Sequence, residues 1–416
     1  MTKLSVKPLE GLLDEPRLIT VEGLAPAQKV VLSTRTLRGN GRYWGSAATY
    51  IADASGRVDL QRDAPVSGSY QGVSALGLLW SQRPEVEGAV DVFPDDVLQP
   101  LVTQISVEGS DQAVALVQRL AAQGVTRRDV REDGLVGTLF TPASAGPHPA
   151  VIVLNGSGGG INEPRAALYA SRGYAALALG YFKAPGLSPY ISNTPLEYFV
   201  AGLDWVRREV QPAHDFVALS GQSRGGELVL LLGSMFPEAV SAVIGYVPSA
   251  LVHGGQAAAD PAVGRDGPAW LYQGQPLVHL WNDNKTASWA AKDAGRRNAE
   301  SISTALLDQD AVQRVAIAVE KIRGPVLLLS AGDDAAWPSA LFSRMAYSRL
   351  QQAGHPWPVQ HLDFEHAGHT ILLPHIPATY SVDGTPAANA EANEQSWQAV
   401  KAFLDEAVNA RAVNAS

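Results

Sequence analysis

A serine between glycines is the first residue in this sequence that could act as a nucleophile. Residues 215–233 read DFVALSGQSRGGELVLLLG, an apolar run that leads through a Gly-rich turn directly into a helical pattern. A serine on such a turn exposes its hydroxyl, and the helix N-terminus offers N–H groups to an anion. The alternative is an ordinary strand-to-helix turn with a serine N-cap. Ser223 is therefore the candidate nucleophile, on an elbow bounded by Gly221 and Gly225.

An acid and a base follow Ser223 in the order that a hydrolase triad requires. Asp333 and Asp334 come directly after an apolar run, and His366 and His369 follow one further short strand pattern. Serine, then acid, then histidine is the chain order of the α/β-hydrolases. Each element alone could be structural, since paired aspartates often lie in solvated turns and a lone histidine is more often structural. Their joint occurrence after strands predicts a Ser–Asp–His triad, with both aspartates and both histidines still open.

A second Gly-rich turn, VLNGSGGGINE at 153–163, could complete an oxyanion hole. Gly156, Ser157 and Gly158 would offer backbone N–H groups, and the second donor would be the N–H of Arg224, the residue after the nucleophile. The rival interpretation is a phosphate-binding loop. No Gly-Lys-Ser/Thr follows, however, and the G-x-G-x-x-G spacing is absent. We therefore expect an oxyanion loop.

Two different patterns of elements must position these residues. The first hundred or so residues contain short alternating runs separated by turn residues, which is typical of a β-sandwich; residues 74–81 are interpreted as one such strand. Residues 110–125 have the apolar spacing of a helix with a glycine stop. Beyond them, near-continuous apolar runs alternate with helical patterns, as in a parallel sheet covered by helices. This predicts a β-sandwich at 1–122 and an α/β-hydrolase domain at 123–416.

Residues at about 249–320 interrupt the α/β alternation and are predicted to form a cap or lid insertion. Its large aromatic residues are candidate walls of an acyl pocket, or simply the insertion's own core: Trp270, Tyr272, Trp281 and Trp289. Its basic residues could meet phosphate groups, although a solvated helix face is the simpler explanation: Lys285, Lys292, Arg296 and Arg297.

Composition narrows the class of protein further. A formal net charge of −9 over 416 residues argues against a nucleic-acid partner, whose phosphates would call for Lys and Arg. The absence of cysteine excludes disulfides, Cys-ligated zinc and a thiol nucleophile. No segment has the roughly 18 consecutive apolar residues of a membrane helix, and the first residues have no apolar signal region, so we expect a cytoplasmic protein. No local metal signature is present and no cofactor is predicted. A homo-oligomer is left open.

Along nearly its whole length the chain resembles the family of acyl-CoA thioesterases and bile acid-CoA:amino acid N-acyltransferases. YWGSAATYIADASGRVDLQRDAP and GSYQGVSALGLLWS resemble that family's immunoglobulin-like N-terminal domain, and GQSRGGELVL, GPVLLLSAGDDAAWPS and AGHTILLPHIP its hydrolase domain. The resemblance implies that Ser223 is the nucleophile and that His369, in AGH, is the base. It favours Asp334, the second aspartate upstream of Trp337, as the acid. Asp333 then remains the fallback, and His366 has no triad role.

One departure from the family bears on the reaction. The amino-acid-conjugating members use a cysteine nucleophile, whereas this chain has Ser223, which favours hydrolysis. The predicted reaction is cleavage of an acyl thioester, acyl-CoA to free acid and CoA, through an acyl-serine and without a metal or redox cofactor. The alternatives are a carboxylesterase, lactonase or peptidase on the same triad, an N-acyltransferase, and a binding protein on a catalytically dead hydrolase fold.

Overall fold

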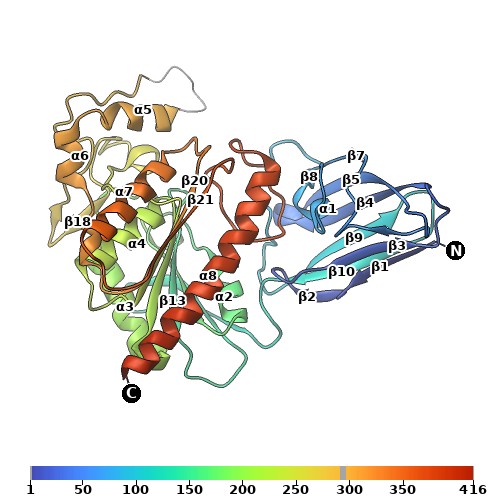
Figure 1. The fold of residues 1–416 in the computed structure, drawn as a ribbon. Coiled ribbons are helices and arrows are strands. Elements are labelled where there is room, and N and C mark those ends of the chain that lie inside the picture. The colour runs from blue at the N-terminus through green and yellow to red at the C-terminus, as the bar shows by residue number, and fades with distance from the viewer. Residues whose placement is uncertain (1, 291–296, 416) are drawn as a thin grey trace. The chain divides into compact units, whose positions relative to one another are not determined.

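The computed structural model describes residues 2–290 and 297–415 (Figure 1). The chain forms two compact units. The first comprises Met1–Gln123 together with Leu372–Trp397, and the second comprises Gly124–Ile371 together with Gln398–Ser416. The segment Leu372–Trp397, which the sequence analysis grouped with the hydrolase domain, thus packs within the first unit.

The first unit is a β-sandwich of two sheets. The smaller sheet contains β1 (Lys3–Lys7), β3 (Leu18–Glu22) and β6 (Val58–Asp59). The larger has the order β2 (Glu10–Leu12), β10 (Ala113–Arg119), β9 (Leu101–Val107), β4 (Lys29–Arg38), β5 (Arg42–Ile51) and β7 (Ser67–Gly68), with β8 (Arg83–Pro84) also paired to β5. Strands of both sheets contribute to one apolar cluster, in which Val21, Leu32 and Ile105 are fully buried. The alternation of apolar residues along these strands is what builds this shared core.

Two predicted elements of this unit are wrong. Residues 110–125, predicted as a helix, contain the strand β10, which pairs antiparallel with β9 over Ala113–Gln118. A short apolar run is compatible with the spacing of a helix and with that of a strand. Here β9 lies alongside and supplies hydrogen-bond partners for the extended backbone. Residues 74–81, predicted as a strand, contain the one-turn helix α1 (Gly77–Trp80). Leu78 and Leu79 are adjacent and both fully buried, whereas a strand would point them to opposite faces.

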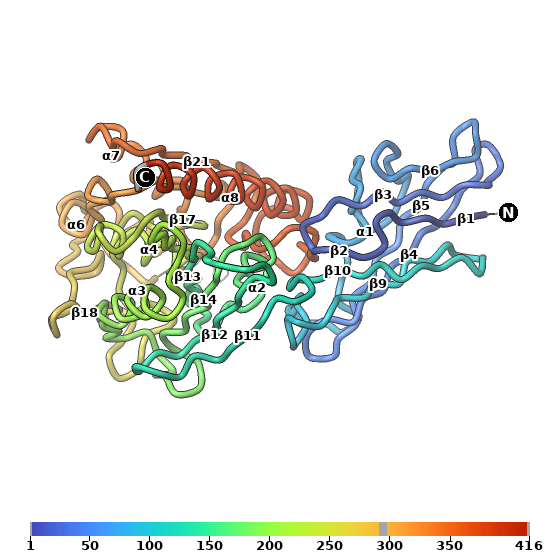
Figure 2. Tube along the Cα trace, turned by 90° about the horizontal axis from the view of Figure 1, so that it is seen from below, coloured from blue at the N-terminus to red at the C-terminus, as the bar shows by residue number. Residues whose placement is uncertain are grey.

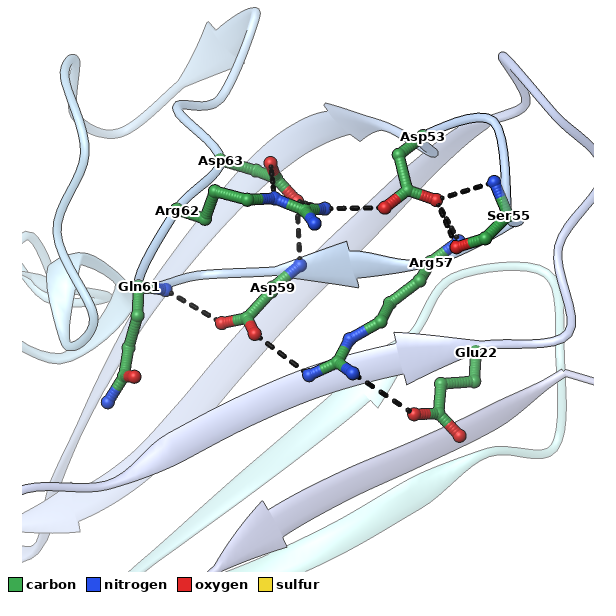
Figure 3. A network of polar contacts seen from close by, with 8 residues as sticks. All are labelled: Glu22, Asp53, Ser55, Arg57, Asp59, Gln61, Arg62 and Asp63. Carbon is green, nitrogen blue, oxygen red and sulfur yellow. Dashed lines mark hydrogen bonds and ion pairs between the residues drawn. The ribbon is translucent and has the colours of Figure 1, made fainter.

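The turn after β5 is held by the aspartate with which it begins, Asp53 (Figure 3). The Asp53 carboxylate accepts the Ser55 hydroxyl at 2.6 Å and the N–H groups of Ser55 and Arg57 at 2.9 and 3.0 Å. It also pairs with Arg62 at 2.7 Å. The Ser55 hydroxyl and these further donors hold the pKa of Asp53 well below its ordinary value. Arg57 reaches on to Asp59 at 2.8 Å, so this network ties the turn to β6.

The second unit is built on one eight-stranded sheet. Its order is β11 (Thr126–Val130), β12 (Val136–Thr141), β14 (Ala175–Gly180), β13 (Ala150–Leu154), β16 (Val217–Gln222), β17 (Ala242–Tyr246), β20 (Val326–Ala331) and β21 (Val359–Phe364). The pairings β11–β12 and β12–β14 are antiparallel, and from β14 to β21 all strands are parallel. This mostly parallel sheet with flanking helices is the α/β-hydrolase fold, which confirms the predicted fold class.

Helices cover the sheet on both faces. They are α2 (Glu163–Ser171), α3 (Glu197–Glu209), α4 (Arg224–Met235), α7 (Ser339–Gln352) and α8 (Pro386–Ala415). In Figures 1 and 2, α2 and the end of α8 lie on one side of the sheet, and α3 and α4 lie on the other. Because both faces are covered, strands such as β13, β16 and β20 are buried at every residue. Across the two described ranges, no helix has the length and apolar character to cross a membrane.

The chain between β17 and β20 contains the predicted insertion. It includes the 3-10 turn η3 (Gln256–Ala258), the short strands β18 (Trp270–Tyr272) and β19 (Gln275–Pro276), the helices α5 (Arg297–Ala305) and α6 (Gln309–Val315), and η5 (Val319–Lys321). β18 also pairs with β15 (Thr194–Pro195). Lys292, Arg296 and the side chain of Arg297 lie outside the described residues, so the phosphate interpretation of these residues stays a prediction.

Candidate active site

Ser223 lies at the junction of β16 and α4 in a backbone conformation that non-glycine residues seldom adopt. Its φ is +57° and its ψ is −118°. Its N–H donates to the carbonyl of Tyr246 on the neighbouring strand at 2.8 Å, and its own carbonyl accepts the N–H of Glu227 at 3.0 Å. The junction is thus anchored to the sheet on one side and to the first helical turn on the other. Strain of this kind persists only where the surroundings enforce it.

The glycines beside Ser223 are required by the close approach of strand and helix. A Cβ placed on Gly221 would lie 2.0 Å from the carbonyl oxygen of Gly225. A Cβ on Gly225 would lie 2.4 Å from the carbonyl oxygen of Leu154, on β13. Both distances are far below any non-bonded contact. Only glycine at these two positions lets α4 begin directly against the sheet.

Ser223, His369 and Asp334 form a hydrogen-bonded chain. The Nε2 atom of His369 is 2.7 Å from the Ser223 Oγ, and its Nδ1 atom is 2.8 and 2.9 Å from the two Asp334 oxygens. Asp334 follows β20 and His369 follows β21, two parallel strands that are adjacent in the sheet. If Nδ1–H donates to Asp334, Nε2 carries no proton and can accept the serine proton. The arrangement can therefore remove a proton from the Ser223 hydroxyl.

The carboxylate of Asp334 is oriented by its own loop. Its side chain is fully buried, and its Oδ1 accepts the N–H groups of Ala336 and Trp337 at 2.9 and 3.1 Å. The Trp337 indole donates to the carbonyl of Val247 at 2.9 Å, and its ring packs edge-on against the His369 ring at 6.0 Å. These contacts hold the acid and one face of the imidazole in place.

The other aspartate and the other histidine lie apart from the serine. The nearest nitrogen and oxygen of His366 and Asp333 are 3.9 Å apart, and 70% and 55% of the two side chains are exposed. Of the four candidates, the structure brings Asp334 and His369 to Ser223. It leaves Asp333 and His366 at the surface of the unit.

The residues of the predicted oxyanion hole are only partly brought together. Arg224 is the first residue of α4, so its N–H has no acceptor within the helix. A Cβ on Gly156 would lie 3.1 Å from the Ser223 Cβ, which places this glycine directly beside the nucleophile. Ser157 and Gly158 are exposed, and no atom lies within 4 Å of a Cβ built on Gly158. Of the predicted members, Gly156 and Arg224 are thus the two that lie next to Ser223.

The turn that carries Gly156 is held in shape on both sides. The Asn155 side chain donates to the carbonyl of Gly159 at 2.6 Å, and the Tyr181 hydroxyl donates to the carbonyl of Asn155 at 2.6 Å. A turn fixed in this way can present backbone N–H groups without rearranging during a reaction.

The sequence analysis missed a buried charged cluster in the first turn of α4, directly after Ser223. The Arg224 guanidinium donates to the Glu227 carboxylate at 2.7 Å, and both side chains are fully buried. Burial raises the pKa of the Glu227 carboxyl, with the Arg224 charge opposing the shift. Burial also holds the pKa of the neighbouring His253 well below its ordinary value, which keeps that imidazole neutral at pH 7. The available signal was two charged residues, three positions apart, in a helix that is otherwise apolar.

Among the aromatic residues of the insertion, Trp270 and Trp281 belong to the apolar core of the second unit, and Trp289 packs against it. Trp270 is 1% exposed, and its ring lies 6.0 Å from Tyr181. Trp281 and Trp289 stack on each other at 4.1 Å. Tyr272 differs, because it lines a cavity of about 820 Å³ along the C-terminal half of α4. Lys285, the one predicted phosphate contact whose side chain is described, is exposed and lies 3.5 Å from Asp310.

Within residues 2–290 and 297–415, no three His, Asp or Glu side chains are grouped so that they could hold a metal ion.

Comparison with known proteins assigns the family. The model described as "Acyl-CoA thioester hydrolase/BAAT N-terminal region" matches residues 14–132, and "BAAT / Acyl-CoA thioester hydrolase C terminal" matches residues 194–410. Acyl-coenzyme A thioesterase 2, mitochondrial, of Rattus norvegicus is 31% identical across 94% of this chain and 86% of its own length. Acyl-coenzyme A thioesterase 1 of Homo sapiens is 30% identical across 94% of this chain and 93% of its own length. This chain therefore belongs to the family of acyl-CoA thioester hydrolases and bile acid-CoA:amino acid N-acyltransferases (BAAT).

Proposed function

We propose that this protein is a serine hydrolase that cleaves acyl-CoA to a free acid and CoA. The observation that carries the proposal is the chain of short contacts from Ser223 through His369 to Asp334, at 2.7 and 2.8 Å. Membership of the family supports an acyl-CoA thioester as the substrate class, because two of its curated members, similar over nearly the whole chain, are named acyl-coenzyme A thioesterases.

The first half-reaction forms an acyl-serine. His369 Nε2 accepts the hydroxyl proton while the Ser223 Oγ attacks the thioester carbonyl carbon. The resulting oxyanion accepts hydrogen bonds from the backbone N–H of Arg224 and from the turn at Gly156. When the intermediate collapses, the C–S bond breaks and His369 returns the proton to the departing CoA sulfur.

The second half-reaction releases the acid. His369 takes a proton from a water molecule, which attacks the acyl-serine carbonyl carbon, and the C–Oγ bond then breaks as the proton passes to Ser223. Asp334 stays ionised throughout, holds the imidazole in the reactive tautomer and stabilises the imidazolium.

The nucleophile favours hydrolysis over conjugation. An acyl-serine is an oxygen ester, which is less reactive toward amines than the thioester that a cysteine nucleophile would form. An amine therefore gains less advantage over water here. We expect free acid, with little amide, even when glycine or taurine is present at millimolar concentration.

The test is a substrate panel with the full-length protein. Acyl-CoA substrates of increasing chain length, matched p-nitrophenyl esters, and acyl-CoA with glycine or taurine are assayed for CoA release, with mass spectrometry of the products. The Ser223→Ala variant serves as the blank and should lose more than about 10³-fold of the rate. Hydrolysis of esters without CoA release would indicate a carboxylesterase, and abundant amide an N-acyltransferase. Failure of Ser223 to react with a fluorophosphonate would indicate a catalytically inactive protein.

A further inference from the structure

The side chain of Arg224 is anchored at three points within the second unit. Its Nη1 donates to the Glu227 carboxylate at 2.7 Å, within the first turn of α4. Its Nη2 donates to the carbonyl of Gly254 and to the side-chain oxygen of Gln256, both at 2.9 Å. Gly254 and Gln256 belong to the insertion. The first turn of the nucleophile helix is thus tied to the insertion through one guanidinium.

Glu227 closes the same cluster from the other side. Its Oε1 accepts the indole N–H of Trp270 at 2.9 Å and the backbone N–H of His253 at 3.2 Å. Both donors also belong to the insertion. Arg224 and Glu227 therefore form one buried polar pair, in which both side chains are bound to residues 253–256 of the insertion and Glu227 is also bound to Trp270.

Trp337 connects this pair to the loop of Asp334. The Arg224 guanidinium lies 5.8 Å from the centre of the Trp337 ring, and the His253 ring lies 5.3 Å from it. The backbone N–H of the same tryptophan donates to Asp334. The start of α4, the insertion and the loop of Asp334 are thereby in contact through one cluster.

Stability alone does not explain a buried pair of this kind. Taking two charges out of water costs about as much as their attraction returns, and apolar side chains of similar volume often stabilise a core equally well. The surrounding helix shows that apolar residues suit this environment, since the other residues of α4 from Leu228 to Leu232 are apolar and buried. The pair does restrict the orientation of the Arg224 side chain, because a planar guanidinium that donates three directed hydrogen bonds can adopt few orientations.

We propose that Arg224 is a positioning residue, whose buried guanidinium fixes the direction of its own backbone N–H toward the oxyanion formed at Ser223. An oxyanion donor must sit at hydrogen-bond distance from the transition state, and a displacement of about 1 Å can cost a factor of 10² in rate. The side chain and the N–H share one Cα, so anchoring the first constrains the second. The inference rests on the proposed function, since the oxyanion exists only if Ser223 attacks a carbonyl.

The expected effect is a loss in the chemical step and not in substrate binding. Arg224→Met should lower kcat about 10- to 100-fold while KM changes less than about 3-fold, because the lost interaction exists only in the transition state. Gln256→Met removes the side-chain acceptor of Arg224, together with the 3.3 Å contact between Gln256 Nε2 and His253 Nδ1, and should lower kcat by roughly 3- to 10-fold. Arg224→Lys keeps the positive charge beside Glu227 but lacks the planar, branched guanidinium. Its kcat should therefore lie between those of the wild type and of Arg224→Met.

The measurement uses full-length protein and counts active sites. Fluorophosphonate titration gives the fraction of reactive Ser223, so kcat is expressed for each working site. The affinity of an acyl trifluoromethyl ketone, whose adduct with Ser223 carries an oxyanion, should weaken by the same factor as kcat/KM. Gln256→Met keeps the proposal testable if Arg224→Met does not fold.

Arg38→Met is the matched control. Arg38 is a buried guanidinium of the first unit, which donates to the carbonyl of Val92 at 2.6 Å and to Gln82 at 2.9 Å. Its loss should lower the melting temperature and leave kcat for each titrated site unchanged. If the Arg224 and Gln256 variants behave in the same way, the positioning role is wrong and the proposed hydrolysis stands. If wild-type Ser223 neither reacts with the fluorophosphonate nor cleaves any substrate, the proposed function fails and the inference fails with it.

Discussion

Two neighbouring aspartates have the same chemistry and different surroundings. Asp334 is fully buried and accepts two backbone N–H groups in addition to the His369 imidazole. Asp333 has 55% of its side chain exposed and lies 3.9 Å from an exposed histidine. At the scale of single residues, backbone direction at the end of β20 therefore separates a candidate triad acid from a surface charge.

This pair gives a controlled test of the acid. Asp334→Asn should lower kcat by about 10³- to 10⁴-fold, because an amide can hold the histidine in the wrong tautomer and cannot stabilise the imidazolium. Asp333→Asn should change kcat less than about 2-fold, since an exposed ion pair contributes little. Steady-state kinetics on the best substrate of the panel, with circular dichroism to verify folding, compares the two variants. Equal losses in both, or a larger loss in Asp333→Asn, would contradict the assignment of the acid.

At the scale of elements, the junction of β16 and α4 depends on contact between backbones. The helix begins one residue after Ser223, and its first turn lies against the end of β13. A side chain at Gly225 has no space there, because the carbonyl oxygens of Leu154 and Asn155 would lie 2.4 and 2.6 Å from its Cβ. The position of Ser223 is therefore a consequence of how closely β16, β13 and α4 pack.

Alanine at this contact should be costly. Gly225→Ala should lower the free energy of unfolding by about 2 to 4 kcal/mol, because either α4 or the end of β13 must move. Gly158→Ala is the matched glycine replacement, with no atom within 4 Å of the new Cβ, and should change the unfolding free energy by less than about 0.5 kcal/mol. Chemical denaturation of both variants measures the difference. A Gly225→Ala protein as stable as wild type would mean that the junction is looser than described.

At the scale of the whole molecule, the chain leaves the first unit and later returns to it. Within that unit, His375 lies 2.8 Å from the carbonyl oxygen of Leu13, Ala378 donates its N–H to Trp80 at 2.9 Å, and Trp397 donates its indole N–H to Asp14 at 2.7 Å. Cutting the chain at residue 122 or 123 would thus separate residues 372–397 from the rest of the first unit, to which they belong.

A truncated chain should reveal this dependence. A fragment beginning at residue 124 keeps Leu373, Ile376 and Trp397, each no more than 1% exposed, but lacks residues 1–123, with which their segment forms the first unit. Exposing three such side chains costs roughly 1.5 to 3 kcal/mol each, so the fragment should melt at a lower temperature and aggregate. Size-exclusion chromatography and thermal melting beside the full-length protein give the comparison. A monomeric fragment with unchanged melting temperature would show that the segment is dispensable.

The sequence by itself determined the parallel sheet and the turn that carries Ser223, the candidate nucleophile. Strands such as β13, β16 and β20 were predicted because a strand buried on both faces must be apolar at every position. The serine between glycines was recognisable because a strand-to-helix junction this tight excludes side chains beside it. Both signals are local, since each depends on residues that are neighbours in the chain.

Tertiary contacts decided the rest, for reasons that a local pattern does not contain. The strand β10 was mistaken for a helix because its pairing with β9, and not its own spacing, selected the extended form. From the residues alone, Asp333 and Asp334 were equivalent, and the cluster around Arg224 was missed. Each depends on contacts between residues tens of positions apart: Asp334 with His369, and Arg224 with Gln256. The spacing of apolar residues along the chain indicates which residues are buried. Which of the buried side chains contact one another is decided only when the chain folds.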